Sequence, residues 1–220
     1  CTNSFGYLVR KKEGTLTYIK LSSALKGNAV VDEGYCKVLQ DAGHIYFYYP
    51  QNIYIYDLAS AQVRVVALSA GGNPSLGVCN IQQKIYVNHH VKGFCILENN
   101  VLKPVGDDHS LDLRRLVFST PFSAKESLLG TATGQLFISD GKKHRPFAQK
   151  AELIVSSTND EWVDATVFDD KVILATNHSG FLIVNKNTEA IESIVNIRYG
   201  LPENDINALY RDGMGRVWLA

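Results

Sequence analysis

Val172-Ile173-Leu174-Ala175-Thr176 and Gly180-Phe181-Leu182-Ile183-Val184-Asn185, separated only by Asn177-His178-Ser179, are the stretch of this sequence that decides the fold. Two short apolar runs joined by a few turn residues are the pattern of a β-hairpin. The same layout recurs upstream at residues 45–57, 85–97 and 128–138. A hairpin that recurs about every 40–45 residues is typical of the blades of a β-propeller.

Each hairpin has a further strand-like run on either side. An apolar run that ends in a polar turn precedes it, and a fourth run such as residues 62–66 or 190–194 follows it. Four short strands per repeat make one propeller blade. The sequence therefore predicts an all-β protein, a β-propeller or part of one, with about five blades' worth of four-stranded antiparallel sheets. No stretch keeps a helical apolar spacing for more than two turns, so we predict no helix.

The predicted units form a single propeller segment over residues 1–220. Residues 6–19 match the last two strands of a blade, whereas residues 206–220 match the first two. Two arrangements stay open: the halves pair and close a ring of about five blades, or the chain is an arc of a larger propeller. The predicted units are a half blade at about 5–22, blades at about 35–68, 76–105, 112–148 and 162–197, and a half blade at about 206–220.

Positive and negative side chains balance in this chain. Lys and Arg total 22, as do Asp and Glu, so no net charge is available to attract nucleic acid or an anionic membrane. We expect neither a nucleic-acid partner nor membrane contact by this segment. The sequence also has no run of ~18 apolar residues, the length that a membrane-spanning helix needs, and no signal segment.

The four cysteines, Cys1, Cys36, Cys79 and Cys95, are far apart and form no CxxC pair. This spacing predicts neither a zinc site nor a redox motif, and we expect no metal and no other cofactor. Cys36, Cys79 and Cys95 lie in apolar runs, where a free cysteine behaves as a small buried hydrophobe. Cys1 is compatible with the start of a lipid-anchored mature protein or with a fragment boundary.

Residues 199–220, YGLPENDINALYRDGMGRVWLA, carry the most specific motif. They combine a Gly-Leu-Pro opening, an Asn, an apolar run, an Asp-Gly turn and an apolar-Trp-apolar run. The combination resembles the two-component regulator propeller repeat, of which the upstream units keep parts or only the strand rhythm. We expect the motif to act structurally, with tight turns at its glycines, proline and aspartate and with its Trp between neighbouring blades. The structural positions are Gly200, Leu201, Pro202, Asn204, Asp212, Gly213, Gly215 and Trp218.

The resemblance implies a biological setting. Proteins with these repeats are commonly the extracytoplasmic sensor regions of bacterial hybrid histidine kinases or related regulators, and they often respond to carbohydrates. The resemblance thus implies a periplasmic or extracytoplasmic location and an oligosaccharide ligand. It also implies contact with the rest of a receptor chain, with a second propeller or with a second copy in a homodimer. The sequence has no phosphoacceptor helix, ATP-binding motif or receiver region, so the chain would carry only the sensing region of such a receptor.

Polar turn residues predict a candidate ligand-binding face. The turns between second and third strands lie at the same end of the blades as the Gly-Leu-Pro segment, and binding concentrates in loops on rigid scaffolds. Exposed turn residues with no ligand are the plainer interpretation. Tyrosines at residues 46–49 and 54–56 could stack on sugar rings, but we expect them to pack between blades. The candidate ligand-binding residues are Asn88, His89, His90, Asn177, His178 and Asn204.

An enzyme is the competing class, because some propellers are glycoside hydrolases that use paired carboxylates. Asp41, Asp169 and Asp212 recur at the same turn position, where an aspartate binds its own backbone. Asp164 and Asp205 are the acids least explained by turns. Nothing in the sequence places them at a catalytic separation, so we predict no catalytic residues and a sensing role. A glycan-cleaving propeller and a protein-interaction scaffold are the alternatives.

Overall fold

The computed structural model describes residues 4–25, 36–69 and 72–220, so Cys1 lies outside the described residues. Four antiparallel sheets of four strands each follow one another along the chain, and a two-stranded sheet lies before and after them. The all-β prediction is confirmed. The strands are β1 (Gly6–Arg10) and β2 (Leu16–Lys20); β3 (Lys37–Gln40), β4 (His44–Tyr48), β5 (Asn52–Asp57) and β6 (Val63–Ala67); β7 (Val78–Ile81), β8 (Lys84–His89), β9 (Gly93–Glu98) and β10 (Val101–Pro104); β11 (Leu116–Pro121), β12 (Ser127–Thr131), β13 (Leu136–Ser139) and β14 (His144–Pro146); β15 (Trp162–Phe168), β16 (Lys171–Thr176), β17 (Phe181–Asn185) and β18 (Ile191–Val195); and β19 (Leu209–Arg211) and β20 (Val217–Leu219).

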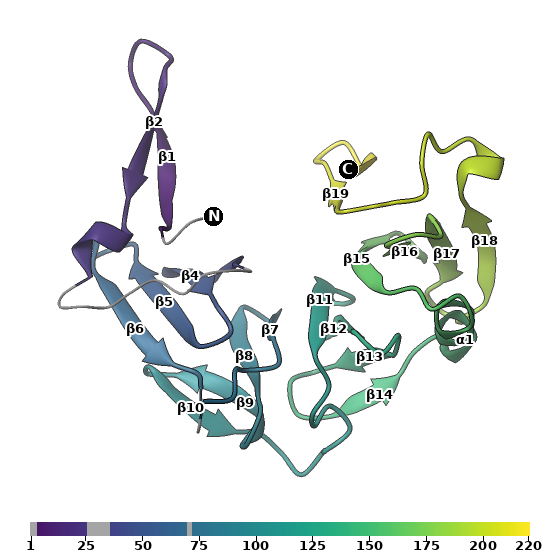
Figure 1. The fold of residues 1–220 in the computed structure, drawn as a ribbon, viewed down its shortest axis with the longest axis horizontal. Helices are drawn as coiled ribbons and strands as arrows, with labels where there is room; N and C mark the ends of the chain where they lie inside the picture. Colours follow the sequence, from purple (N-terminus) through teal and green to yellow (C-terminus); the bar gives the residue numbers. More distant parts are fainter. Residues whose placement is uncertain (1–3, 26–35, 70–71) are drawn as a thin grey trace.

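The sheets stand side by side in an arc (Figure 1). Within each sheet the strand order follows the chain order, because short turns join every strand to its antiparallel neighbour. The first strands of successive sheets contact one another, β3 with β7, β7 with β11 and β11 with β15. These first strands therefore form the inner side of the arc.

The core lies between neighbouring sheets. One cluster joins the last two four-stranded sheets and includes Trp162, of which 1% is exposed. Cys79 and Cys95 are fully buried free thiols, and burial raises their pKa values to about 12 and about 11. Cys36 is half-buried and also free. The buried side chains of the strands fill the space between neighbouring sheets, as the alternation of apolar and polar residues in the sequence predicts.

The prediction of no helix is wrong at α1 (Gln149–Ser157), which connects β14 to β15. Ala151 and Val155 are its buried residues, one turn apart, and they join the core between the last two four-stranded sheets. The Glu152 carboxylate accepts a hydrogen bond from the Leu136 backbone N–H at 2.8 Å. Nine residues contain too few apolar positions for a helical period to stand out in the sequence.

The two-stranded sheets lie at the opposite ends of the arc, and β1 and β20 have no strand pairing with each other (Figure 1). The described residues therefore form an open arc. Trp218 was expected between blades, but 53% of it is exposed in the described part of the chain. Its indole N–H donates to the Asp212 carboxylate at 2.9 Å. This bond and those from the Arg216 and Met214 backbone N–H groups lower the pKa of Asp212 to about 2.

Candidate functional site

A groove runs along the end of the sheets at which the first strand turns into the second. We call it the first-turn groove; its volume is about 660 Å³, within the range of small-molecule sites. It crosses the three sheets that begin with β3, β7 and β11. Its lining is rich in amides, hydroxyls and carboxylates: Gln40, Asp41, Ala42, Asn80, Gln82, Gln83, Ser119, Pro121, Ser123, Ala124, Glu126 and Ser127.

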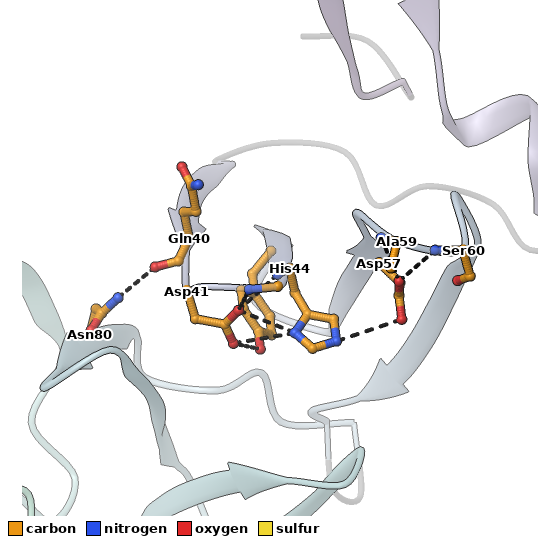
Figure 2. Close-up of polar contacts among 9 residues, drawn as sticks. Gln40, Asp41, His44, Asp57, Ala59, Ser60 and Asn80 are labelled. Atoms are coloured by element: carbon orange, nitrogen blue, oxygen red, sulfur yellow. Dashed lines mark hydrogen bonds and ion pairs between the residues drawn. The ribbon is translucent and has the colours of Figure 1, made fainter.

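Side-chain to backbone hydrogen bonds hold the three sheets together below the groove. The Asn80 amide donates to the Gln40 carbonyl oxygen at 2.8 Å, which ties β7 to β3 (Figure 2). The Ser127 hydroxyl donates to the Asn80 carbonyl oxygen at 3.1 Å, and the Gln82 amide donates to the Lys125 carbonyl oxygen. The walls of the groove are therefore built from fixed groups rather than from independent loops.

Asp41 braces one wall of the groove. Its carboxylate accepts the backbone N–H groups of Gly43 and His44 at 2.8 Å each and the Tyr46 hydroxyl. Although burial alone would raise the pKa of Asp41, these bonds together hold it below its usual value. Figure 2 shows the His44 ring between two carboxylates, with Nδ1 3.2 Å from Asp41 and Nε2 3.8 Å from Asp57. This cluster fixes the turn after β3.

The turn of the middle sheet, which also lines the groove, is strained. Gln82 and Gln83, which join β7 to β8, have φ values of 51° and 59°. A two-residue hairpin turn with both φ values positive normally uses Asn and Gly, because a larger residue in the left-handed region costs ~1–2 kcal/mol. Both side chains are exposed at the groove. Backbone strain at positions that present polar side chains to a groove is often found at functional sites.

A second hollow, of about 990 Å³, shares Glu126 with the first-turn groove. His144 lies in its wall with 8% of its surface exposed; its Nδ1 is 2.9 Å from the Ser139 hydroxyl. Its Nε2 is buried and has no hydrogen-bond partner among the described residues. The Asp108 carboxylate accepts the His144 backbone N–H at 2.6 Å. Burial lowers the pKa of His144, although Asp108 and Asp140 oppose the shift.

The lowered pKa of His144 predicts a loss of stability in weak acid. Below the unfolded-state pKa of 6.5 the unfolded chain takes up a proton that the folded histidine resists, so stability falls with pH in that window. The buried His89 acts in the same direction. We expect His144→Gln to lose less stability than the wild type between pH 7 and pH 5 in urea denaturation. An unchanged pH dependence in His144→Gln would contradict the assignment.

Two residues of the predicted ligand-binding face are buried. Asn88 is fully buried, and its amide donates to the carbonyl oxygens of Leu111 and Arg114 at 2.7 Å each. His89 is 4% exposed, and its Nδ1 accepts the backbone N–H groups of Val91 and Lys92 at 3.1 Å each. Both side chains hold the connections around β8, and their role as ligand contacts stays a prediction.

The other predicted residues lie in turns and loops at or near the surface, and the Gly180 backbone N–H, which donates to the Asn204 carbonyl oxygen at 3.0 Å, brings Asn204 beside the turn of Asn177 and His178. His90 is part of the turn after β8, whereas Asn177 and His178 follow β16. The His178 Nδ1 is 3.2 Å from the Asp205 carboxylate, and the Asn204 carboxamide oxygen accepts the Ile197 backbone N–H at 2.9 Å. These turns lie at the other end of the second strands from the first-turn groove. The sequence predicted the ligand site at the turns between second and third strands, whereas the first-turn groove lies at the opposite end of the sheets.

Asp164, which turn geometry did not explain, accepts a structural hydrogen bond at each carboxylate oxygen. One oxygen accepts the Ala165 backbone N–H at 2.8 Å, and the other accepts the Leu209 backbone N–H at 2.9 Å, which ties β19 to β15. Asp205 pairs with His178. Asp169, like Gln82 and Gln83, has a positive φ, of 52°. Among the described residues, no group of three or more His, Cys, Asp or Glu side chains is placed to hold a metal ion.

The tyrosine-rich strands pack inward. The side chains of Tyr46, Tyr48, Tyr49, Tyr54 and Tyr56 are at most 9% exposed. Tyr54 and Phe5 have ring centroids 4.9 Å apart, so the β1–β2 hairpin is joined to the next sheet by aromatic packing. The packing role that we expected for these rings is confirmed. In the described ranges, no helix has the length and apolar content that a membrane crossing requires.

Solved structures with the same fold identify the architecture of this chain. Neither a family model nor a curated protein matches the sequence. A catalytically inactive virginiamycin B lyase from Staphylococcus aureus, solved with quinupristin, matches 99% of this chain and 77% of its own with a TM-score of 0.64 at 9% identity. The β-propeller domain of Cps50 (Swd1) from Myceliophteria thermophila matches 84% of this chain and 62% of its own, with a TM-score of 0.58 at 9% identity. The chain has the β-propeller architecture.

Two structures of the extracellular domain of BT4673 from B. thetaiotaomicron also match the fold of this chain. BT4673 is described in one as a proposed one component system and in the other as a proposed hybrid two component system. The first matches 83% of this chain with a TM-score of 0.61 at 15% identity, and the second matches 88% with a TM-score of 0.60 at 17% identity. The chain spans about a quarter of the length of these two proteins, 25% and 27%.

Proposed function

We propose that this chain is a ligand-sensing propeller region of an extracytoplasmic two-component receptor, and that it recognises a carbohydrate at the first-turn groove. The fold similarity to the extracellular domain of BT4673 supports the sensing role. The repeat-like segment at residues 199–220 supports the same family of receptors independently, because its argument rests on sequence rather than on shape. The proposal assigns binding to this region and leaves signalling to other parts of a receptor.

The chemistry of the first-turn groove supports a sugar ligand. Sugar hydroxyls both donate and accept hydrogen bonds, so they are matched by amides, hydroxyls and carboxylates together. Gln83 and Ser123 are exposed in the groove, and Glu126 is partly buried there, with its carboxylate 3.1 Å from the Ser123 hydroxyl. The amides of Asn80 and Gln82 are already used to fix the walls. We therefore assign ligand contacts to Gln83, Ser123 and Glu126.

Thermal-shift and calorimetric titration against a panel of oligosaccharides tests the proposal. An oligosaccharide present at ~100 times its Kd should stabilise the fold by ~2.7 kcal/mol. Gln83→Gly should weaken binding because it removes the amide, yet raise stability by ~1 kcal/mol because glycine relieves the positive φ. Glu126→Ala should weaken binding as well. Asn177→Ala changes a polar turn residue at the other end of the blades and is the matched control.

Two results would contradict the proposal in different ways. Binding that is lost in Asn177→Ala but kept in Gln83→Gly would return the ligand site to the face predicted from the turns. Reducing ends released from the sugar, and lost in Asp164→Asn, would favour the glycan-cleaving alternative. If no sugar in the panel shifts the melting temperature, carbohydrate recognition by this region is wrong.

A further inference from the structure

A third hollow, which we call the middle hollow, lies between the first-turn groove and the second hollow. Its volume is about 690 Å³. Gln82, Ser123 and Glu126 line both the middle hollow and the first-turn groove. Asp140 and Lys142 line both the middle hollow and the second hollow. The middle hollow therefore adjoins both, and a ligand that is longer than the first-turn groove can extend into it.

Cationic side chains distinguish the middle hollow from the first-turn groove. In the part of the chain that the structure describes, the lining of the groove contains no Lys, Arg or His, whereas that of the middle hollow contains Lys84, Lys125 and Lys142. All three lysines are exposed. Ion pairs hold Lys103 and Lys171 elsewhere, but the described residues form none with the lysines of the middle hollow. Their ammonium groups are thus available to a ligand.

The middle hollow has fewer carboxylates than ammonium groups. One carboxylate oxygen of Asp140 accepts the backbone N–H groups of Lys142 and Lys143 at 2.8 Å each, and these bonds lower the pKa of Asp140. The Glu126 carboxylate lies where the hollow meets the first-turn groove, 3.1 Å from the Ser123 hydroxyl. Three ammonium groups and two carboxylates leave a positive balance in the hollow. A cleft with an excess of one charge attracts ligands of the opposite charge.

Tyr86 adds a buried hydrogen-bond donor to the middle hollow. The residue is 5% exposed, and its ring stacks on that of Phe94 with centroids 5.3 Å apart. Its hydroxyl lies over Gly141, where a Cβ atom would be 2.3 Å from the hydroxyl oxygen, and it has no hydrogen-bond partner among the described residues. Burial raises the pKa of Tyr86, so the hydroxyl stays protonated. A buried polar group without a partner costs free energy, and an acceptor on a ligand in the hollow would remove that cost.

We propose that the sugar bound at the first-turn groove carries a negatively charged unit, with a uronate carboxylate or a sulfate ester, and that this unit binds in the middle hollow. The inference rests on the carbohydrate-binding function proposed above. The Tyr86 hydroxyl donates to an oxygen of the anionic group, and Lys84, Lys125 and Lys142 supply the opposite charge. Neutral units of the same ligand lie in the first-turn groove, where the described lining has no cation. The ligand is therefore an acidic oligosaccharide bound in one orientation.

Matched pairs of acidic and neutral oligosaccharides test the charge requirement. One pair is an oligogalacturonate and its methyl ester, and the other is a carrageenan oligosaccharide and its desulfated form. In calorimetric titration we expect an acidic member to bind about 10-fold more tightly than its neutral partner, because hydrogen bonds to charged groups are stronger than neutral ones. The pair that shows the difference identifies carboxylate or sulfate as the recognised group. The difference should shrink as salt is raised, because salt screens exposed charges.

Tyr86→Phe isolates the effect of the hydroxyl. The ring can keep its packing on Phe94, and the hydroxyl has no partner to lose within the described chain, so the melting temperature of the free protein should not fall. Affinity for the acidic oligosaccharide should fall about 10-fold. Lys142→Gln should lower it by about 2–5-fold, as expected for an exposed ion pair. Lys92→Gln is the matched control, because Lys92 is exposed in the turn after β8 and lines none of these hollows, and it should leave the affinity unchanged.

Failure of this inference can be told apart from failure of the proposed function. Equal affinities within both pairs of oligosaccharides would overturn the acidic unit, while sugar binding at the first-turn groove would stand. An acidic preference that is kept in Tyr86→Phe and in Lys142→Gln, or one that is lost in Lys92→Gln, would overturn the assignment of the anionic group to the middle hollow. If neither the acidic nor the neutral sugars bind, the proposed function is wrong and this inference is wrong with it.

Discussion

Trp162→Ala is expected to lower the free energy of unfolding by about 3–5 kcal/mol, the cost of truncating a fully buried large aromatic residue. Only 1% of Trp162 is exposed, and its indole N–H donates to the Gly134 carbonyl oxygen at 2.6 Å. The substitution opens a cavity between the last two complete blades and leaves that carbonyl without its partner. Urea denaturation followed by circular dichroism measures the change.

The other tryptophan of the chain provides the control. Trp218 is 53% exposed, and Trp218→Ala should change the free energy of unfolding by no more than ~0.5 kcal/mol. This comparison separates the effect of burial from the effect of residue type. Similar losses for the two substitutions would mean that Trp162 does not hold the inter-blade core.

Gly180→Ala is the second substitution with a large expected effect. Gly180 has a φ of 81°, a left-handed conformation that costs an alanine ~1–2 kcal/mol. The new Cβ would also lie 2.1 Å from the Val195 carbonyl oxygen, so β17 and β18 must move apart. We expect a total loss of at least about 2 kcal/mol, because displacement of packed strands adds ~1–3 kcal/mol to the strain. Denaturation midpoints measure it.

Gly213→Ala is the matched control for that substitution. No atom lies within 4 Å of a Cβ built on Gly213. Its stability should stay within ~0.5 kcal/mol of the wild type. A loss as large as that of Gly180→Ala would show that glycine content, rather than the close approach of two strands, sets the effect.

The sheets could be predicted because strand periodicity is local. Leu182 and Val184 alternate with less buried neighbours, and this pattern is visible in any short window of sequence. The helix at Gln149–Ser157 escaped prediction because only Ala151 and Val155 are buried in it. The helix packs in a space beside the last complete blade, and this space cannot be inferred from a short stretch of sequence around the helix.

The candidate site could not be predicted in the same way. Its walls are fixed by backbone carbonyls of Gln40 and Lys125, and every residue has a carbonyl. Asn88 and His89 were predicted at a ligand-facing turn because they are polar and follow an apolar run. The structure extends β8 to His89, and the Asn88 amide meets two carbonyls of the connection to the next blade. That connection is far enough along the chain that the sequence alone cannot place it.

Strand order has a consequence for the way this chain acquires its structure. Each complete blade is built from one uninterrupted stretch of sequence, and its four strands are paired in the order in which they are synthesised. None of the described strands has to wait for a partner from a distant part of the polypeptide, so the entropy of loop closure stays small at each step. Every new blade can then form on the flank of the one before it, as the units of a solenoid do. Folding of the nascent chain can thus proceed from the amino terminus toward the carboxyl terminus during translation.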